Sequence, residues 1–195
     1  MLPMIRLSNM MRSFFALAAT LLLFAGCAST RHRTTQELLT PPKTFQFLPD
    51  KAILAAEEAA VSNAVYWHTE VEKAIAYQLV LKGFSEQTTG STDVLVAFHV
   101  ILQRGEQTTF LDNYSGYSLS AKEQAEQADI EKYLTAPGTK NRSILIVDVI
   151  DPVKQQVVWR EWTQAPTRTG VSTAQRERAI QKAVRKIFSD FPPQA

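Results

Sequence analysis

Residues 143–164 read SILIVDVIDPVKQQVVWREWTQ, which is two β-rich runs on either side of a polar, proline-containing turn. Runs of this composition at this separation predict an antiparallel hairpin. Successive side chains of a strand point to opposite faces. Trp159 and Glu161 are therefore predicted on one face of the hairpin, and Arg160 and Trp162 on the other. The hairpin predicts a sheet with one tryptophan on each face.

A second β-rich segment covers residues 93–103, and its alternate side chains are apolar on both faces. One face carries Val94, Val96, Phe98 and Val100, and the other carries Leu95, Ala97, His99 and Ile101. Apolar groups on both faces predict a central strand. A shorter strand is predicted at 44–48, and Pro49 follows it.

Two amphipathic helices are predicted from apolar residues that recur every three or four positions. The first covers about residues 64–82 and ends at Gly83, which fits a left-handed C-terminal cap. The second begins at Ser172 or Thr173 and continues to the C-terminal prolines. Their apolar faces contain Trp67, Val71, Ala74, Ile75 and Leu79 in the first helix, and Ile180, Ala183, Val184, Ile187 and Phe191 in the second.

Two further helices complete the prediction. Ser120 is followed three residues later by Glu123, a capping-box pattern that predicts a helical insertion to about Leu134. A shorter helix is predicted over 51–60. Together the elements predict an α/β (α+β) fold, built as a two-layer sandwich. Its antiparallel or mixed sheet has about four strands and carries two main helices and the helical insertion.

The N-terminal 26 residues have the three parts of a secretory signal. Arg6 and Arg12 precede an apolar run of 12 residues, Phe14 to Ala25, and the only cysteine, Cys27, follows. The preceding Leu23, Phe24, Ala25 and Gly26 form a lipobox pattern. The pattern predicts cleavage before Cys27 and covalent lipid, including palmitate-type acyl chains, on that residue. A plain secretory signal and an uncleaved short membrane anchor stay open, as does the initiator among Met1, Met10 and Met11.

The predicted organisation is a signal peptide at 1–26, a lipidated cysteine with a flexible tether at 27–42, and one α/β domain at 43–193. No aspartate follows Cys27, and under the sorting rules of Gram-negative lipoproteins this favours the outer membrane. We expect attachment to its inner leaflet, with the domain in the periplasm.

Charge argues against nucleic-acid binding, and composition argues against disulfide bonds. Loss of the first 26 residues lowers Lys+Arg from 21 to 19, equal to the 19 acidic residues. A formally neutral chain lacks the basic surplus of a nucleic-acid-binding protein. With Cys27 lipidated, no cysteine remains for a disulfide.

Four segments in order resemble bacterial envelope lipoproteins grouped as domain of unknown function 4136. They are Thr44 to Pro49, a helix leading to Lys82-Gly83-Phe84, Asp93 to His99, and Ser143 to Arg160 with the closing helix to Pro193. The family's tyrosine- and glycine-rich middle segment is reduced here to Tyr114-Ser115-Gly116-Tyr117. The resemblance implies an α/β sandwich in a lipoprotein setting, and it implies no catalytic residues.

The sequence contains little catalytic material. It has three histidines, of which His32 lies in the predicted tether and His99 in a predicted central strand. His99 would act as a base only if the sheet brought Asp93 or Asp148 close to it. No nucleophile elbow, zinc-ligand spacing or phosphate-binding glycine loop occurs. We expect no enzyme, no metal site and no cofactor besides the lipid on Cys27.

Binding has better candidates. If helices covered only one sheet face, His99, Arg160 and Trp162 would form an exposed patch on the other, and exposed aromatics with arginine often anchor partners. Tyr114 and Tyr117 lie in a segment expected to be a loop. Both tryptophans under helices, and an ordinary insertion at the tyrosines, stay open as alternatives. The expected function is a binding or accessory module for an envelope protein; small-ligand binding is the alternative, and a hydrolase is the last choice.

Overall fold

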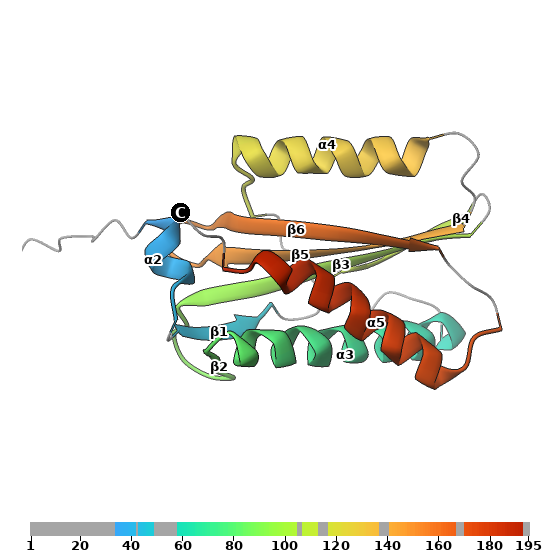
Figure 1. Cartoon of the computed structure of the whole chain (residues 1–195), viewed down its shortest axis with the longest axis horizontal. Coiled ribbons are helices and arrows are strands. Elements are labelled where there is room, and N and C mark those ends of the chain that lie inside the picture. The colour runs from blue at the N-terminus through green and yellow to red at the C-terminus, as the bar shows by residue number, and fades with distance from the viewer. Residues whose placement is uncertain are drawn as a thin grey trace, which may run out of the picture. The chain divides into compact units, whose positions relative to one another are not determined.

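The computed structural model describes residues 34–41, 43–48, 58–104, 107–112, 117–136, 141–166 and 170–192. Its elements are α2 (Thr35–Leu39), β1 (Lys43–Phe47), α3 (Glu58–Leu81), β2 (Phe84–Glu86), β3 (Val94–Arg104), β4 (Gln107–Asp112), α4 (Ala121–Thr135), β5 (Asn141–Asp151), β6 (Gln156–Pro166), α5 (Thr173–Ile187) and the 3-10 turn η3 (Phe188–Asp190), as Figure 1 shows. The predicted signal peptide, Cys27 and most of the helix predicted at 51–60 lie outside the described residues.

The strands form one mixed sheet in the order β2-β1-β3-β5-β6, with β4 also paired to β3. Strand β3 is central, as predicted. It pairs with β5 along one side, and along the other side it pairs first with β1 and then with β4. β1 pairs with Val94–Val96 in parallel, and β4 pairs antiparallel from His99 onward. The predicted hairpin is confirmed as β5 and β6. Strands β2 and β4 were not predicted; β2 is only three residues long, and β4 lies in a segment that was expected to be irregular.

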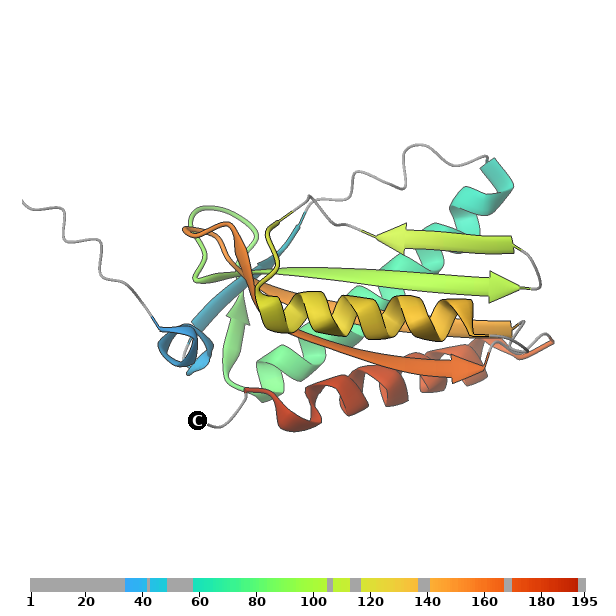
Figure 2. The ribbon, with the colours of Figure 1, turned by 90° about the horizontal axis from the view of Figure 1, so that it is seen from above.

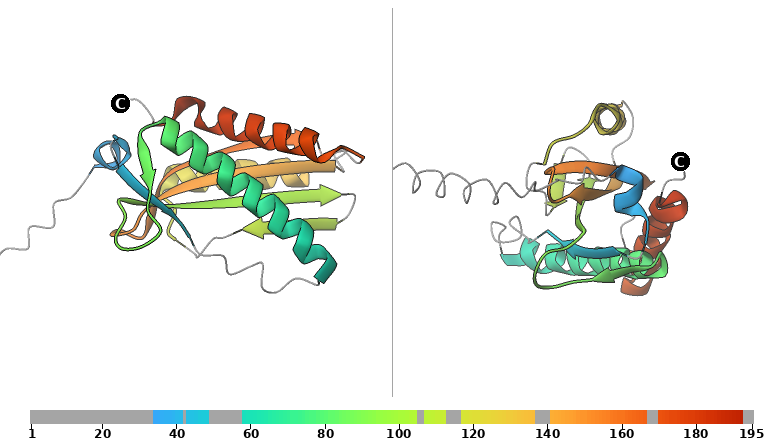
Figure 3. Two further views of the ribbon diagram at one scale, coloured as in Figure 1. Left: turned by 90° about the horizontal axis from the view of Figure 1, so that it is seen from below. Right: turned by 90° about the vertical axis from the view of Figure 1, so that its left-hand side faces the viewer.

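Helices lie on both faces of this sheet. Helices α3 and α5 pack side by side on one face, and the inserted helix α4 lies across part of the other (Figures 1 and 2). The end-on view in Figure 3 shows the layers in cross-section. The sandwich of α3 and α5 against the sheet contains the main core, in which Phe45, Ile75, Leu79, Phe98 and Val184 are fully buried. On the other face, two smaller clusters form where α4 and the segment before it pack on the sheet.

Local sequence signals are confirmed at three helix ends. Gly83 has φ +86°, the left-handed conformation predicted for the end of α3. Ser120 and Glu123 form the predicted capping box at the start of α4, and Ser172 and Gln175 form the one at the start of α5. These signals act within a few residues, so they do not depend on the rest of the fold.

The predicted flexible tether at 27–42 is wrong in its second half. Thr34 and Glu37 form a capping box, and helix α2 follows directly. Leu38 and Leu39 are buried in the main core. The compact unit therefore begins at Thr34, whereas the predicted boundary was residue 43. The surrounding sequence is polar, so it gave no sign that a helix here packs on the domain. The burial of Leu38 and Leu39 depends on strands and helices that are distant in the chain.

Candidate functional site

An ion pair lies at the centre of the sheet face beneath α4. Asp148 on β5 and Arg160 on β6 are directly opposite each other in the strand register. Arg160 Nε donates to Asp148 Oδ1 and Arg160 Nη2 donates to Oδ2, both at 2.6 Å. Asp148 is 0% exposed and Arg160 is 3% exposed. This is the two-pronged geometry in which guanidinium and carboxylate interact most strongly.

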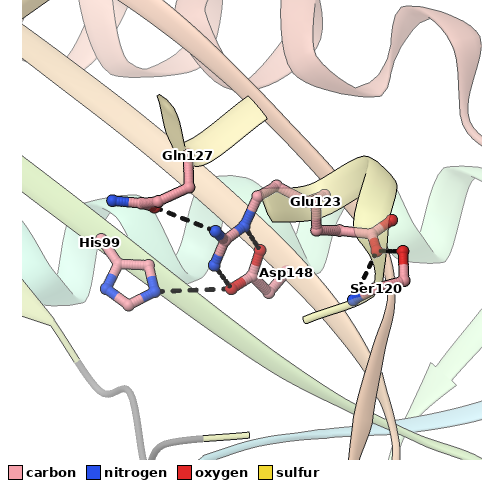
Figure 4. A network of polar contacts seen from close by, with 6 residues as sticks. His99, Ser120, Glu123, Gln127 and Asp148 are labelled. Carbon is pink, nitrogen blue, oxygen red and sulfur yellow. Dashed lines mark hydrogen bonds and ion pairs between the residues drawn. The ribbon is translucent and has the colours of Figure 1, made fainter. Parts of the chain in front are cut away.

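Two further side chains extend the pair into what we call the Asp148 network: His99, Gln127, Asp148 and Arg160 (Figure 4). His99 Nε2 on β3 lies 3.5 Å from Asp148 Oδ2. Gln127 Oε1 on α4 accepts a hydrogen bond from Arg160 Nη1 at 3.1 Å. The network therefore ties three neighbouring strands to the helix that covers them.

The network keeps Asp148 charged. Burial by itself would raise the pKa of Asp148, but hydrogen bonds from Arg160 and His99 outweigh burial and lower the pKa below its usual value. Both carboxylate oxygens already accept hydrogen bonds from Arg160. A general base needs contact with a substrate proton. A fully buried carboxylate that accepts two hydrogen bonds from one arginine has the geometry of a structural ion pair instead.

The structure brings three of the predicted binding residues together but changes their setting. His99, Arg160 and Trp162 do lie on one sheet face, as strand alternation predicted. The condition for an exposed patch, a sheet face without helices, is not met: the His99 side chain is 14% exposed, and Trp162 is half-buried, 6.1 Å from the Tyr133 ring of α4. The helical insertion covers the face that two helices alone would have left open.

The other predicted residues divide differently. Tyr117 is half-buried and packs on the same sheet face, against a cluster that includes Ala97 and Ile150. Tyr114 lies outside the described residues. Trp159 faces the opposite side and is buried in the main core, with ring centroids 5.5 Å from Phe188 and 4.8 Å from Phe191.

Of the two carboxylates considered as partners for His99, Asp148 is the one that reaches it. Asp93 instead accepts hydrogen bonds from the backbone N–H and hydroxyl of Thr44, at 2.9 and 3.0 Å. These bonds hold β1 at the start of β3. His68 is also structural in its surroundings: it is buried, its ring lies 4.5 Å from that of Phe98, and Nδ1 is 3.4 Å from Glu72.

Sequence reasoning missed an exposed apolar surface on α3. Tyr77, Val80 and Leu81 are 62%, 55% and 61% exposed, and we call them the α3 patch. They lie at positions i, i+3 and i+4, which are neighbours on a helix surface. Beside the patch, α3 and α5 form an open groove of about 470 Å³, lined by Glu70, Lys73, Ala74, Tyr77, Gln78, Glu177, Ile180, Gln181 and Arg185. A helical wheel of the sequence could have revealed the patch, because these three apolar residues lie away from the buried apolar face of α3.

The described ranges contain neither a candidate membrane span nor a candidate metal site. No helix there combines the length and apolar character needed to cross a membrane. No group of three or more His, Cys, Asp and Glu side chains there is placed to hold a metal ion.

These features define an α+β domain with a mixed sheet, an ion pair buried beneath an inserted helix and an exposed apolar patch on another helix. The chain belongs to the family described as Domain of unknown function (DUF4136), whose model matches residues 35–193. That match begins at the first residue of α2 and so includes the helix that the tether prediction missed.

No curated protein matches the sequence. Among solved structures, the chain is similar to a PDZ domain protein from Parabacteroides distasonis ATCC 8503, with 14% identity and a TM-score of 0.47. The similarity covers 78% of this chain and 32% of that protein, so this chain spans about a third of its length.

Proposed function

We propose that this chain is a lipid-anchored, non-enzymatic module of the bacterial cell envelope that docks a partner protein through the α3 patch. The observation that carries the proposal is the exposure of three large apolar side chains side by side on one helix. Single exposed apolar residues are ordinary, whereas contiguous patches with a polar rim mark interaction sites. Tyrosine is also among the residues that dominate binding energy at protein interfaces.

The surroundings of the patch favour a partner helix. The adjacent groove is open and lined by charges of both signs, including Glu70, Lys73, Glu177 and Arg185. Small ligands bind in largely enclosed apolar pockets. An amphipathic helix instead lays its apolar side on an exposed apolar surface and pairs its polar edges with flanking charges. The partner we propose is therefore an envelope protein that presents such a helix.

The anchor is proposed from Cys27 and its lipobox, with attachment to the inner leaflet of the outer membrane. Because the compact unit begins at Thr34, few residues separate it from the lipid. The segment from Cys27 to Thr34 spans roughly 25 Å when fully extended. The domain would accordingly stay close to the membrane surface, where an envelope partner is within reach.

Replacing Cys27 with serine is expected to release the protein from the membrane, because each buried lipid methylene contributes about 0.8 kcal/mol to anchoring and the variant carries no lipid. The measurement is the distribution of the protein between washed membranes and the periplasmic fraction. Ser29→Ala, close to the anchor, should leave the distribution unchanged. Retention of the Cys27→Ser protein in washed membranes would show that lipid on Cys27 is not the anchor.

Docking through α3 predicts that Tyr77→Ser combined with Leu81→Ser weakens partner binding at least tenfold, in line with the loss of apolar contacts at the centre of an interface. A photoreactive side chain at Val80 should crosslink one recurrent envelope protein in living cells. The double substitution should abolish that adduct. Thermal unfolding checks that the variant is folded, since exposed positions contribute little to the core.

The matched control is Val153, which is 85% exposed in the turn between β5 and β6. Neither a crosslinker at Val153 nor Val153→Ser should affect the adduct. Recovery of the same partner in equal amounts from the α3 double variant and the wild type would refute docking through this patch.

A further inference from the structure

Arg142, near the start of β5, is a buried cation that forms no ion pair within the described part of the chain. Its side chain is on the sheet face covered by α4, and the residue is 3% exposed. The guanidinium lies over the Tyr133 ring at 4.2 Å, and Nη2 makes a long contact of 3.4 Å with the carbonyl oxygen of Ala136. Nε and Nη1 are buried and have no hydrogen-bond partner among the residues that the structure describes. Within the described ranges no carboxylate pairs with it.

Arg160 on the same face provides the contrast. Its guanidinium forms two bonds to Asp148 and one to Gln127, so its charge and most of its donors are satisfied. Buried arginines are ordinarily paired in this way, because removing an unpaired charge from water is strongly unfavourable. Arg142 has the same burial with a ring face and one long carbonyl contact in place of an anion. Its unused N–H donors are suited to a carboxylate from outside the chain.

The surroundings of Arg142 are apolar. The adjoining cluster contains the buried residues Ile101, Ile130, Ile144 and Ile146, with half-buried Tyr133, Leu134 and Trp162 packed against it. Tyr133 contacts both the Arg142 guanidinium and the Trp162 ring. A cationic group at the edge of an apolar and aromatic cluster is complementary to an amphipathic anion, with its charge at Arg142 and its apolar body on Leu134 and Trp162.

We propose that Arg142, together with Tyr133 and Trp162, binds the carboxylate of an apolar acid between α4 and the β5–β6 hairpin. The carboxylate accepts a hydrogen bond from Nη2, where it replaces the long contact to Ala136, and a second from Nε or Nη1, each of which shares one edge of the guanidinium with Nη2. The hydrocarbon part lies on the half-buried edge of the cluster. This site is on the opposite face of the sheet from the α3 patch. The proposal of an acid-binding site is therefore independent of the proposal that a partner docks on α3.

The test uses the full-length protein in a non-ionic detergent and three probes: octanoate, 1-octanol and acetate. Calorimetric titration should show saturable binding of octanoate, with at least tenfold weaker binding of octanol, which lacks the charge, and of acetate, which lacks the chain. Inorganic phosphate serves as a further arm. If phosphate or acetate binds as tightly as octanoate, the site recognises charge alone and the proposed apolar acid is wrong.

Variants make the assignment specific. Arg142→Met should weaken octanoate binding at least tenfold, and Arg142→Lys, which keeps the charge but loses the planar fork, should weaken it by a smaller factor. Arg178→Met, on the exposed side of α5, is the matched control and should bind as the wild type does. Without ligand, Arg142→Met should unfold at the same or a higher temperature, because an unpaired buried charge has been removed. Octanoate binding that is absent in the wild type, or unchanged in Arg142→Met, overturns the proposal.

Discussion

Replacing Arg160 with methionine is expected to lower the free energy of unfolding by about 3–5 kcal/mol, because the substitution leaves Asp148 as a buried charge without its main partner. Chemical denaturation of the purified protein measures the loss. The double variant Asp148→Val with Arg160→Met should recover most of it, since a well-packed apolar pair of similar size is often as stable as a buried ion pair. Arg178→Met should change stability by no more than about 0.5 kcal/mol.

Acidification should affect the wild type and Arg160→Met differently, because the pKa of Asp148 is shifted in opposite directions in the two proteins. In the wild type the pKa of Asp148 is lowered, so its contribution is complete above the unfolded-state value of about 3.9 and is lost as pH falls further. In Arg160→Met, burial is no longer offset by the guanidinium and the pKa of Asp148 rises. The deficit of that variant should therefore shrink on acidification. If the loss in free energy of unfolding of Arg160→Met is small at neutral pH, or does not change with pH, Asp148 and Arg160 are not a stabilising charge pair.

Replacing Trp159 with alanine is expected to cost about 3–5 kcal/mol, the usual range for removing a large aromatic side chain from a core. Trp159 is buried between the sheet and the C-terminal segment, where its ring contacts Phe188 and Phe191. The cavity that remains would loosen the end of α5 from β6. Denaturant unfolding followed by circular dichroism provides the measurement.

Trp162→Ala is the matched control for Trp159→Ala, because it removes the same side chain from the same strand on the opposite face. Trp162 is half-buried, packed against Tyr133 of α4, so less apolar surface is lost. We expect a cost of about 1–2 kcal/mol. Equal losses for the two tryptophans would mean that the α4 face is packed as tightly as the main core, contrary to the structure.

Helix α4 explains why two predictions about the same residues had different outcomes. Alternation along β6 placed Arg160 and Trp162 on one face, and this is confirmed. Their exposure depended on whether a third helix reached that face, and Gln127 of α4 makes the contact that closes over Arg160. The sequence predicted both the helix and the strand, but nothing local indicated that they pack together.

The candidate site also depended on strand register. Asp148 and Arg160 are each visible in the sequence as charges within apolar strands, yet their pairing requires β5 and β6 to align at these two positions. The register includes a shift between Val149 and Ile150, which no turn rule predicted. His99 reaches the pair only because β3 lies beside β5. Arg142 is less visible still, because its burial follows from α4. That Nε and Nη1 lack a partner among the described residues can be recognised only in three dimensions.

Local interactions explain what the sequence by itself determined: the hairpin, the central strand, the left-handed Gly83 and the capping boxes at Ser120 and Ser172. Each is set by side chains within one helix turn, one strand or one hairpin, so the chain need not be folded for the signal to exist. The tertiary structure alone decided the burial of Leu38 and Leu39, the pairing of Asp148 with Arg160 and the covering of one sheet face by α4. These features depend on contacts between residues far apart in the chain, where burial and register are settled by the packing of the whole domain.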